Sequence, residues 1–267
     1  MATRVEEYRQ KLRASKDVEG FLRTHSGLPG PRGNLELAHA FALEGSPADV
    51  RRFASLDAGA APENTPGVFL AFCGILGLSR MVVRGDHDAE AILRRRASDP
   101  RWRVREAVAT CLQLVGDEDR RSFARIVTSL ARGTPLEQRA AVAAVAEPRL
   151  LSDTASVGAG LKLLDRVTAS LAKASRPLGE AEMILRQALA YAWSVVVAAE
   201  PATGKQIMEG WLTSGDSDIQ WLMRQNLSKK RLQKTDSAWC ERWAKRLAAK
   251  SGSGARMKTG RKAAGRK

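Results

Sequence analysis

Cysteine, histidine and aromatic residues are all scarce in this chain of 267 residues. The three cysteines lie far apart, with no CxxC pair: Cys73, Cys111 and Cys240. The three histidines are scattered in the same way: His25, His39 and His87. This pattern offers neither a disulfide framework nor the ligand spacing of a zinc site. We therefore expect reduced, structural thiols, no metal and no cofactor.

Standard catalytic motifs are also missing from the sequence. It contains no GxxxxGKS/T, no GxSxG and no HExxH, which argues against P-loop NTPases, α/β-hydrolases and zinc proteases. No apolar run reaches the ~18–20 residues of a membrane span, and the best candidate covers only 67–78. The first residues carry charges where a signal peptide needs an apolar stretch. We expect a cytoplasmic protein that does not bind a membrane.

Alternating strand patterns are rare, whereas helical spacing dominates. One stripe of apolar positions spaced three or four residues apart consists of Val104, Ala107, Val108, Cys111, Leu112 and Val115. Such a stripe is typical of a helix with one buried face. Asp99 and Pro100 precede it as a predicted cap and first-turn residue. The sequence predicts an all-α fold with helices near 3–13, 17–25, 34–44, 47–57, 64–83, 87–97, 100–115, 118–131, 135–146, 154–174, 180–199, 202–213, 217–229 and 236–249.

A degenerate repeat links two of these helices. Asp99, Trp102, Arg105 and Val108 recur without gaps as Asp218, Trp221, Arg224 and Leu227. A fainter copy covers 136–142, where Arg139 lies 34 residues after Arg105 and 85 residues before Arg224. The longer interval is about two units of ~42 residues, near the period of HEAT-type repeats. In such an array these arginines are predicted to link neighbouring repeats, and the aspartates to cap helices.

Two segments carry a family resemblance. Residues 99–109 resemble the inner-helix signature of HEAT-like repeat proteins, including the DNA alkylation-repair (alkylpurine DNA glycosylase) superfamily, and 221–232 resemble the closing repeat of the same group. The resemblance implies an α-α superhelix, a HEAT-like repeat solenoid, over residues 1–250. Residues 251–267 have no acid and no core-forming residue beyond Met257, so we expect them to form a disordered Lys/Arg-rich tail.

The same resemblance suggests one enzymatic hypothesis. Family members release alkylated bases with an acid supported by tryptophans, and one part of that site is a Trp followed four residues later by Asp. Here Trp102 is followed by Glu106 at the same spacing, and residues four apart share one face of a helix. The alternative is that Trp102 and Glu106 only pack between repeats. We favour that alternative because Trp recurs at Trp221, where Gln225 takes the place of the acid.

Positive charge is concentrated at one end of the chain. The formal charge is +15, and residues 219–267 hold fifteen bases and two acids. Clustered Lys/Arg are typical of proteins that bind polyanions, although a solvated tail that only raises solubility would look the same. The predicted nucleic-acid-binding residues are Arg94, Arg95, Arg96, Arg101, Arg103, Lys229, Lys230, Arg231, Lys234, Arg242, Lys245, Arg246, Arg256, Lys258, Arg261 and Lys262.

Three functions are compatible with these features. The first, which we favour, is a repeat scaffold that binds duplex DNA through its backbone, because the basic clusters lack the interleaved aromatics of single-strand binders. The second is a DNA glycosylase that releases alkylated purines. The third is a protein-binding scaffold whose partner is an acidic protein.

Overall fold

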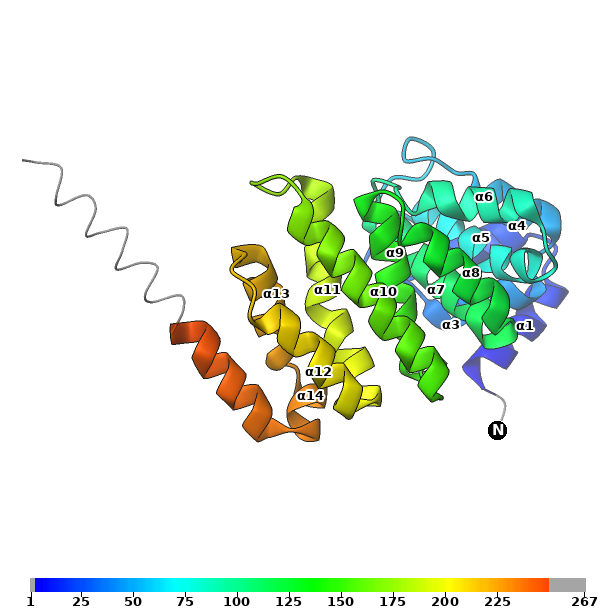
Figure 1. The fold of residues 1–267 in the computed structure, drawn as a ribbon. Helices are drawn as coiled ribbons and strands as arrows, with labels where there is room; N and C mark the ends of the chain where they lie inside the picture. The colour runs from blue at the N-terminus through cyan, green and yellow to red at the C-terminus, as the bar shows by residue number, and fades with distance from the viewer. Residues whose placement is uncertain (1–2, 250–267) are drawn as a thin grey trace, which may run out of the picture. The chain divides into compact units, whose positions relative to one another are not determined.

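The computed structural model describes residues 3–249, and within this range every regular element is helical (Figure 1). The predicted all-α class is confirmed. The elements are α1 (Arg4–Ala14), α2 (Val18–Thr24), α3 (Leu35–Glu44), α4 (Pro47–Ala54), α5 (Pro66–Val83), α6 (His87–Arg96), α7 (Trp102–Glu118), α8 (Arg120–Leu130), α9 (Pro135–Val145), the 3-10 helix η1 (Pro148–Leu150), α10 (Thr154–Lys173), α11 (Glu180–Ala199), α12 (Pro201–Leu212), α13 (Ser217–Leu227) and α14 (Lys230–Thr235). A last helical stretch covers 237–249.

Side-chain caps explain where most helices begin. Short polar side chains accept hydrogen bonds from the free N–H groups of the first turn. Helices that start in this way have the caps Thr3, Asp17, Asn34, Ser46, Asp86, Asp119, Asp153 and Asp216, and the longer Glu200 side chain caps α12 in the same manner. Because capping is local in sequence, these starting points could be predicted to within a residue or two.

The predicted start of α7 was wrong. The helix begins at Trp102 with Arg101 as the N-cap residue, and no side chain caps it. Asp99 accepts a hydrogen bond from the Arg101 N–H at 2.9 Å, but it also binds arginine side chains, as described below. The separate helix α14 and the short η1 were not predicted either, because each is too short to show a periodic apolar stripe.

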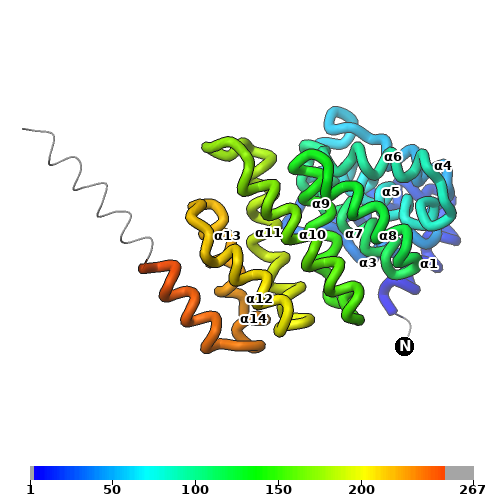
Figure 2. Tube along the Cα trace, in the orientation of Figure 1, coloured from blue at the N-terminus to red at the C-terminus, as the bar shows by residue number. Residues whose placement is uncertain are grey.

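The chain forms two compact units, residues 1–144 and 145–267. In unit 1, α1, α3, α5 and α7 pack side by side in succession, while α4, α6 and α8 pack against members of that row. Figure 2 shows the Cα trace of these helices in the orientation of Figure 1. Gly74 allows α4 to approach α5 closely, since a Cβ there would lie 2.3 Å from the Ala54 backbone nitrogen.

Helix α5 is the core helix of unit 1 and is more apolar than we expected. Its 18 residues have a mean hydropathy of 1.8, so that by length and composition the helix could cross a membrane. Within the protein, however, 78% of this stretch is buried. The helix predicted at 64–83 ends at the same residue as α5, but the apolar run noted in the sequence, 67–78, covers only part of it. A helix buried in a protein core can have the same amino-acid composition as a membrane-spanning helix.

In unit 2, α11 is the helix with the most neighbours. It packs against α10, α12, α13 and α14. Trp193 of α11 is fully buried, and its indole N–H donates to the Thr168 hydroxyl at 3.0 Å. The buried Asn226 of α13 accepts from the Ser194 N–H and donates to the Leu189 carbonyl, both at 2.9 Å. These bonds fix α13 against the middle of α11.

Candidate nucleic-acid interface

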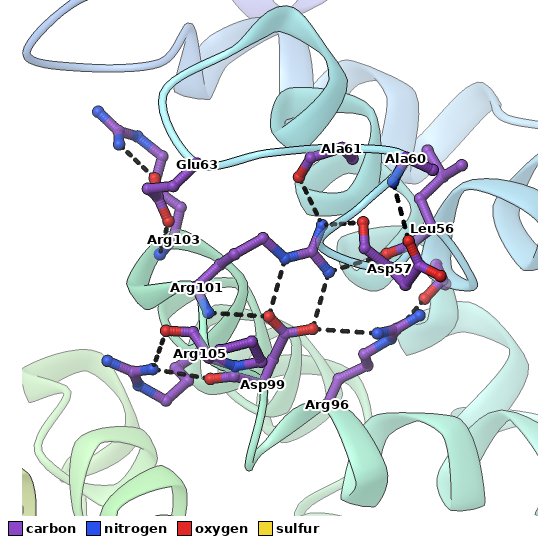
Figure 3. A network of polar contacts seen from close by, with 12 residues as sticks. Leu56, Asp57, Ala60, Ala61, Glu63, Arg96, Asp99, Arg101, Arg103 and Arg105 are labelled. Carbon is purple, nitrogen blue, oxygen red and sulfur yellow. Dashed lines mark hydrogen bonds and ion pairs between the residues drawn. The ribbon is translucent and has the colours of Figure 1, made fainter. Parts of the chain in front are cut away.

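Arg101 and Asp99 form a buried ion pair in unit 1 (Figure 3). The Asp99 carboxylate accepts from Arg101 Nε at 2.8 Å and Nη2 at 2.7 Å. The remaining guanidinium hydrogens go to the backbone carbonyls of Leu56, Asp57 and Ala61 at 2.8–2.9 Å. All five N–H donors of Arg101 are therefore used, and its side chain is only 3% exposed.

The charge of Asp99 is stabilised by this arrangement. Burial opposes ionisation of the carboxyl group, but hydrogen bonds from Arg101 and the charges of Arg101 and Arg96 outweigh burial and lower the Asp99 pKa. Arg96 adds a contact to Asp99 at 3.0 Å and donates to the Ala54 carbonyl at 2.8 Å. The group ties the link before α7 to the segment after α4.

Two further arginines of this predicted cluster are also engaged within unit 1. Arg103 is paired with Glu63 and donates to the Gly30 carbonyl at 2.9 Å. Arg94 is paired with Glu137 at 2.6 Å and donates to the Ser129 hydroxyl.

These contacts change the role assigned to the 94–103 cluster. Arg101 and Arg103 are buried, which differs from the predicted surface role, and their donors are directed into the protein. Arg94 and Arg95 are exposed, but only the Arg95 side chain makes no hydrogen bond or ion pair with residues 3–249. Dense arginine in a sequence can thus indicate internal bonding to backbone carbonyls as readily as a binding surface.

The Trp102 and Glu106 side chains have structural partners of their own. Trp102 is 49% exposed, and the Arg103 guanidinium lies 4.5 Å from the centre of its ring. The Glu106 carboxylate is paired with Arg139 of α9, which also donates to the Arg105 carbonyl at 2.9 Å. Arg139 therefore links α9 to α7 as predicted for a repeat arginine, and these contacts account for both members of the hypothetical catalytic pair.

The repeat position in unit 2 has matching contacts. Asp218 is paired with Arg186 and with Arg176, the latter at 3.0 Å. The Arg186 guanidinium lies 4.2 Å from the centre of the Trp221 ring. In both copies, then, the aspartate binds arginine side chains and the tryptophan carries a guanidinium group. The prediction that Asp218 is the helix cap was wrong, since Asp216 caps α13.

One group of basic residues in unit 2 differs from Arg176 and Arg186, which are paired with aspartates. We name this group the C-terminal basic surface: Lys229, Lys230, Arg231, Lys234, Arg242, Lys245 and Arg246. Five of them are exposed and two are half-buried. Among the described residues, no carboxylate forms an ion pair with any of the seven. Their positive charge is therefore available to a partner outside the chain.

Helix α12 contacts the helical stretch 237–249, which carries Arg242, Lys245 and Arg246 of this surface. Its Glu209 accepts from the indole N–H groups of Trp239 at 2.7 Å and Trp243 at 3.2 Å. Lys205, also on α12, is paired with Asp236 at 2.8 Å. Helix 237–249 is docked by its tryptophans, which leaves Arg242 and Lys245 exposed.

Sequence reasoning missed one residue at this surface. Tyr191 of α11 is 44% exposed, its hydroxyl accepts from Arg231, and the Arg231 guanidinium lies 4.6 Å from the centre of its ring. The two residues are 40 positions apart, so no local pattern connects them. The tail residues Arg256, Lys258, Arg261 and Lys262 lie outside the described range.

Other reactive groups do not form a second site. In the part of the chain that the structure describes, no group of three or more His, Cys, Asp or Glu side chains could hold a metal ion. Burial raises the pKa of all three cysteine thiols, which keeps them protonated and weakly nucleophilic at neutral pH.

Comparison with known proteins adds no family assignment. No protein-family model matches the chain, and no curated protein sequence matches it significantly.

Proposed function

We propose that this chain is a HEAT-like helical repeat protein, a solenoid that binds nucleic acid through the phosphate backbone. The expected ligand is duplex DNA, and the binding residues are those of the C-terminal basic surface, helped by the cationic tail at 251–267. The observation that carries the proposal is a set of seven cationic side chains, none of which forms an ion pair with a carboxylate in residues 3–249.

Regular polar links between alternate helices of unit 1 support the repeat architecture. In unit 1, arginine–carboxylate pairs join α4 to α2, α4 to α6 and α8 to α6, with sequence separations of 33, 35 and 35 residues. These pairs are Arg52–Glu19, Arg51–Asp86 and Arg125–Glu90. A constant separation is expected when similar helix pairs stack on one another. The interval is shorter than the ~42 residues expected from sequence.

The two clusters of basic residues differ in their acidic partners, and this difference supports the C-terminal basic surface as the binding site. Acids in unit 1 are paired with arginines of the predicted 94–103 cluster, whereas the C-terminal basic surface has no such partners. Cationic side chains that are free to move can displace counterions from phosphates, which gives sequence-independent affinity. No base-reading element is needed for such binding.

The test removes four of these charges. The variant Lys230→Gln/Lys234→Gln/Arg242→Gln/Lys245→Gln should bind duplex DNA more weakly, and its log–log salt slope should be lower by up to about four units. The matched control neutralises four exposed bases of unit 1, Lys16, Arg32, Arg84 and Arg121, and therefore has the same net charge. Equal weakening in both variants, measured by fluorescence anisotropy, would show that only total charge matters.

The glycosylase hypothesis stays a prediction beside this proposal. If Glu106 is a general acid or base, the unmodified protein should release alkylated purines from methylated DNA. Glu106→Gln should then abolish release without lowering the melting temperature. No release by the unmodified protein would end this hypothesis.

A further inference from the structure

An exposed aromatic ring lies at the C-terminal basic surface. Tyr191 is one of the four large apolar or aromatic side chains that are exposed in the described residues. Its ring carries the Arg231 guanidinium at 4.6 Å, and the hydroxyl group accepts a hydrogen bond from the same arginine. This contact holds two flat groups against each other and leaves much of the ring accessible to solvent.

The backbone around Tyr191 is firmly held. The Ser194 hydroxyl donates to the Tyr191 carbonyl at 2.7 Å. Asn226 binds the Leu189 carbonyl two residues before Tyr191 and the Ser194 N–H three residues after it, and Asn226 is fully buried. A ring on such a support loses little conformational entropy when a ligand stacks on it.

Free cations flank Arg231 on α14. Lys230 and Lys234 are four residues apart and share one face of the helix, opposite the buried Leu232. Both are exposed, and neither forms an ion pair with a described residue. A planar aromatic–guanidinium pair beside two free ammonium groups matches a nucleotide, which has a flat base and a charged phosphate.

We propose that Tyr191 and Arg231 form a stacking platform for an unpaired nucleobase, with Lys230 and Lys234 binding the adjacent phosphates. This inference rests on the proposed nucleic-acid function and adds to backbone binding of a duplex a preference for strands or sites with unpaired bases. In a duplex both faces of each base are covered by neighbours, so a platform of this kind can engage only a base outside the stack. An acidic protein would use the lysines but would have no use for the exposed ring.

Unit 1 contains a similar pair of an exposed aromatic ring and a guanidinium group, which can be compared with Tyr191 and Arg231. Trp102 and Arg103 have almost the same arrangement, with the guanidinium 4.5 Å from the ring centre. There, however, Glu63 neutralises the buried arginine. We therefore assign base stacking to Tyr191 alone, and Trp102→Leu serves as the matched control for loss of an exposed ring.

The experiment compares strands that differ only in their bases. Fluorescence anisotropy is measured with the full chain and a labelled oligothymidine of about twelve nucleotides, an abasic strand of equal length, and a duplex. The unmodified protein should bind the thymidine strand about 5- to 150-fold more tightly than the abasic strand, the effect of stacking one base. Tyr191→Leu should reduce this ratio to about one, whereas Tyr191→Phe and Trp102→Leu should retain it.

A second variant covers the case in which Tyr191→Leu fails to fold. Arg231→Lys keeps the charge but removes the planar group, and it should also lower the ratio. If the unmodified protein binds both strands equally, the platform is wrong while the proposed function stands. If it binds neither strand nor the duplex, the proposed function fails as well. Tighter binding of polyglutamate than of any oligonucleotide would overturn both in favour of an acidic protein partner.

Discussion

At the residue scale, Arg101 shows how neighbouring groups can engage every donor of an arginine, so that the side chain is not available to bind a partner. Its five donors bind one carboxylate and three backbone carbonyls within unit 1. A lysine has three donors in a different geometry and could not replace this fork. The side chain thus holds the loop after α4 against the start of α7.

Arg101→Gln should lower the free energy of unfolding by about 3–5 kcal/mol, because it leaves the buried Asp99 without its main partner. Urea unfolding followed by circular dichroism measures this change. Arg95→Gln is the control, since Arg95 is exposed and makes no hydrogen bond or ion pair with the described residues, and its effect should be within about 0.5 kcal/mol. A similar small loss for Arg101→Gln would show that the network does not stabilise unit 1.

Glu44 gives a pH-dependent contribution to stability. Hydrogen bonds from Arg13 and Arg9, and their charges, lower the pKa of its carboxyl group from 4.5 to about 2. A lowered pKa in the folded state stabilises the fold above pH 4.5, and this stabilisation is lost as the pH falls toward 2.

Glu44→Gln should therefore destabilise the protein at pH 7 and flatten the change in unfolding free energy between about pH 5 and pH 2. The control is Glu36→Gln on the same helix, for which no ion pair exists in the described residues. Denaturant titrations at several pH values test this expectation. Equal pH profiles for the Glu44→Gln variant and the unmodified protein would refute the proposed role of the α1–α3 ion pairs.

At the element scale, Asn226 joins α13 to α11 by side-chain bonds to the backbone. Asn226→Leu keeps the branched shape of the side chain but leaves the Ser194 N–H and the Leu189 carbonyl without this buried partner. Each unsatisfied group costs about 1–3 kcal/mol, so the free energy of unfolding should fall by at least this amount. The neighbouring Gln225→Leu should have little effect. A thermal melt of both variants decides whether Asn226 or general packing holds the two helices.

The helices could be predicted from sequence because caps and apolar stripes are local. Asp86 lies directly before its helix, and the stripe of α7 is visible without any tertiary contact. The cap of α13, in contrast, was assigned to Asp218 instead of Asp216. The candidate site could be predicted less well from the sequence than the helices. Whether an arginine binds carbonyls, as Arg101 does, or stacks on an exposed ring, as Arg231 does, depends on segments about 40 residues away.

At the scale of the whole molecule, the distribution of charge separates two uses of basic residues. Arginines of unit 1 mostly serve to join helices through carboxylates and carbonyls, whereas the seven residues of the C-terminal basic surface remain unpaired with acids in the described chain. Residues 251–267 add six bases and no acid. The excess charge is thus a property of one end of the chain and not of its helices in general.

The most direct test of this account is the salt dependence of duplex binding by the full chain and by a chain that ends at residue 250. We predict a steep fall of log affinity with log salt concentration between about 50 and 200 mM. Truncation should reduce the slope by up to about five units if all six tail bases contact phosphate, and the C-terminal basic surface should preserve a measurable slope. A full chain that does not bind duplex DNA at about 50 mM salt, or binds with no salt dependence, would contradict the account.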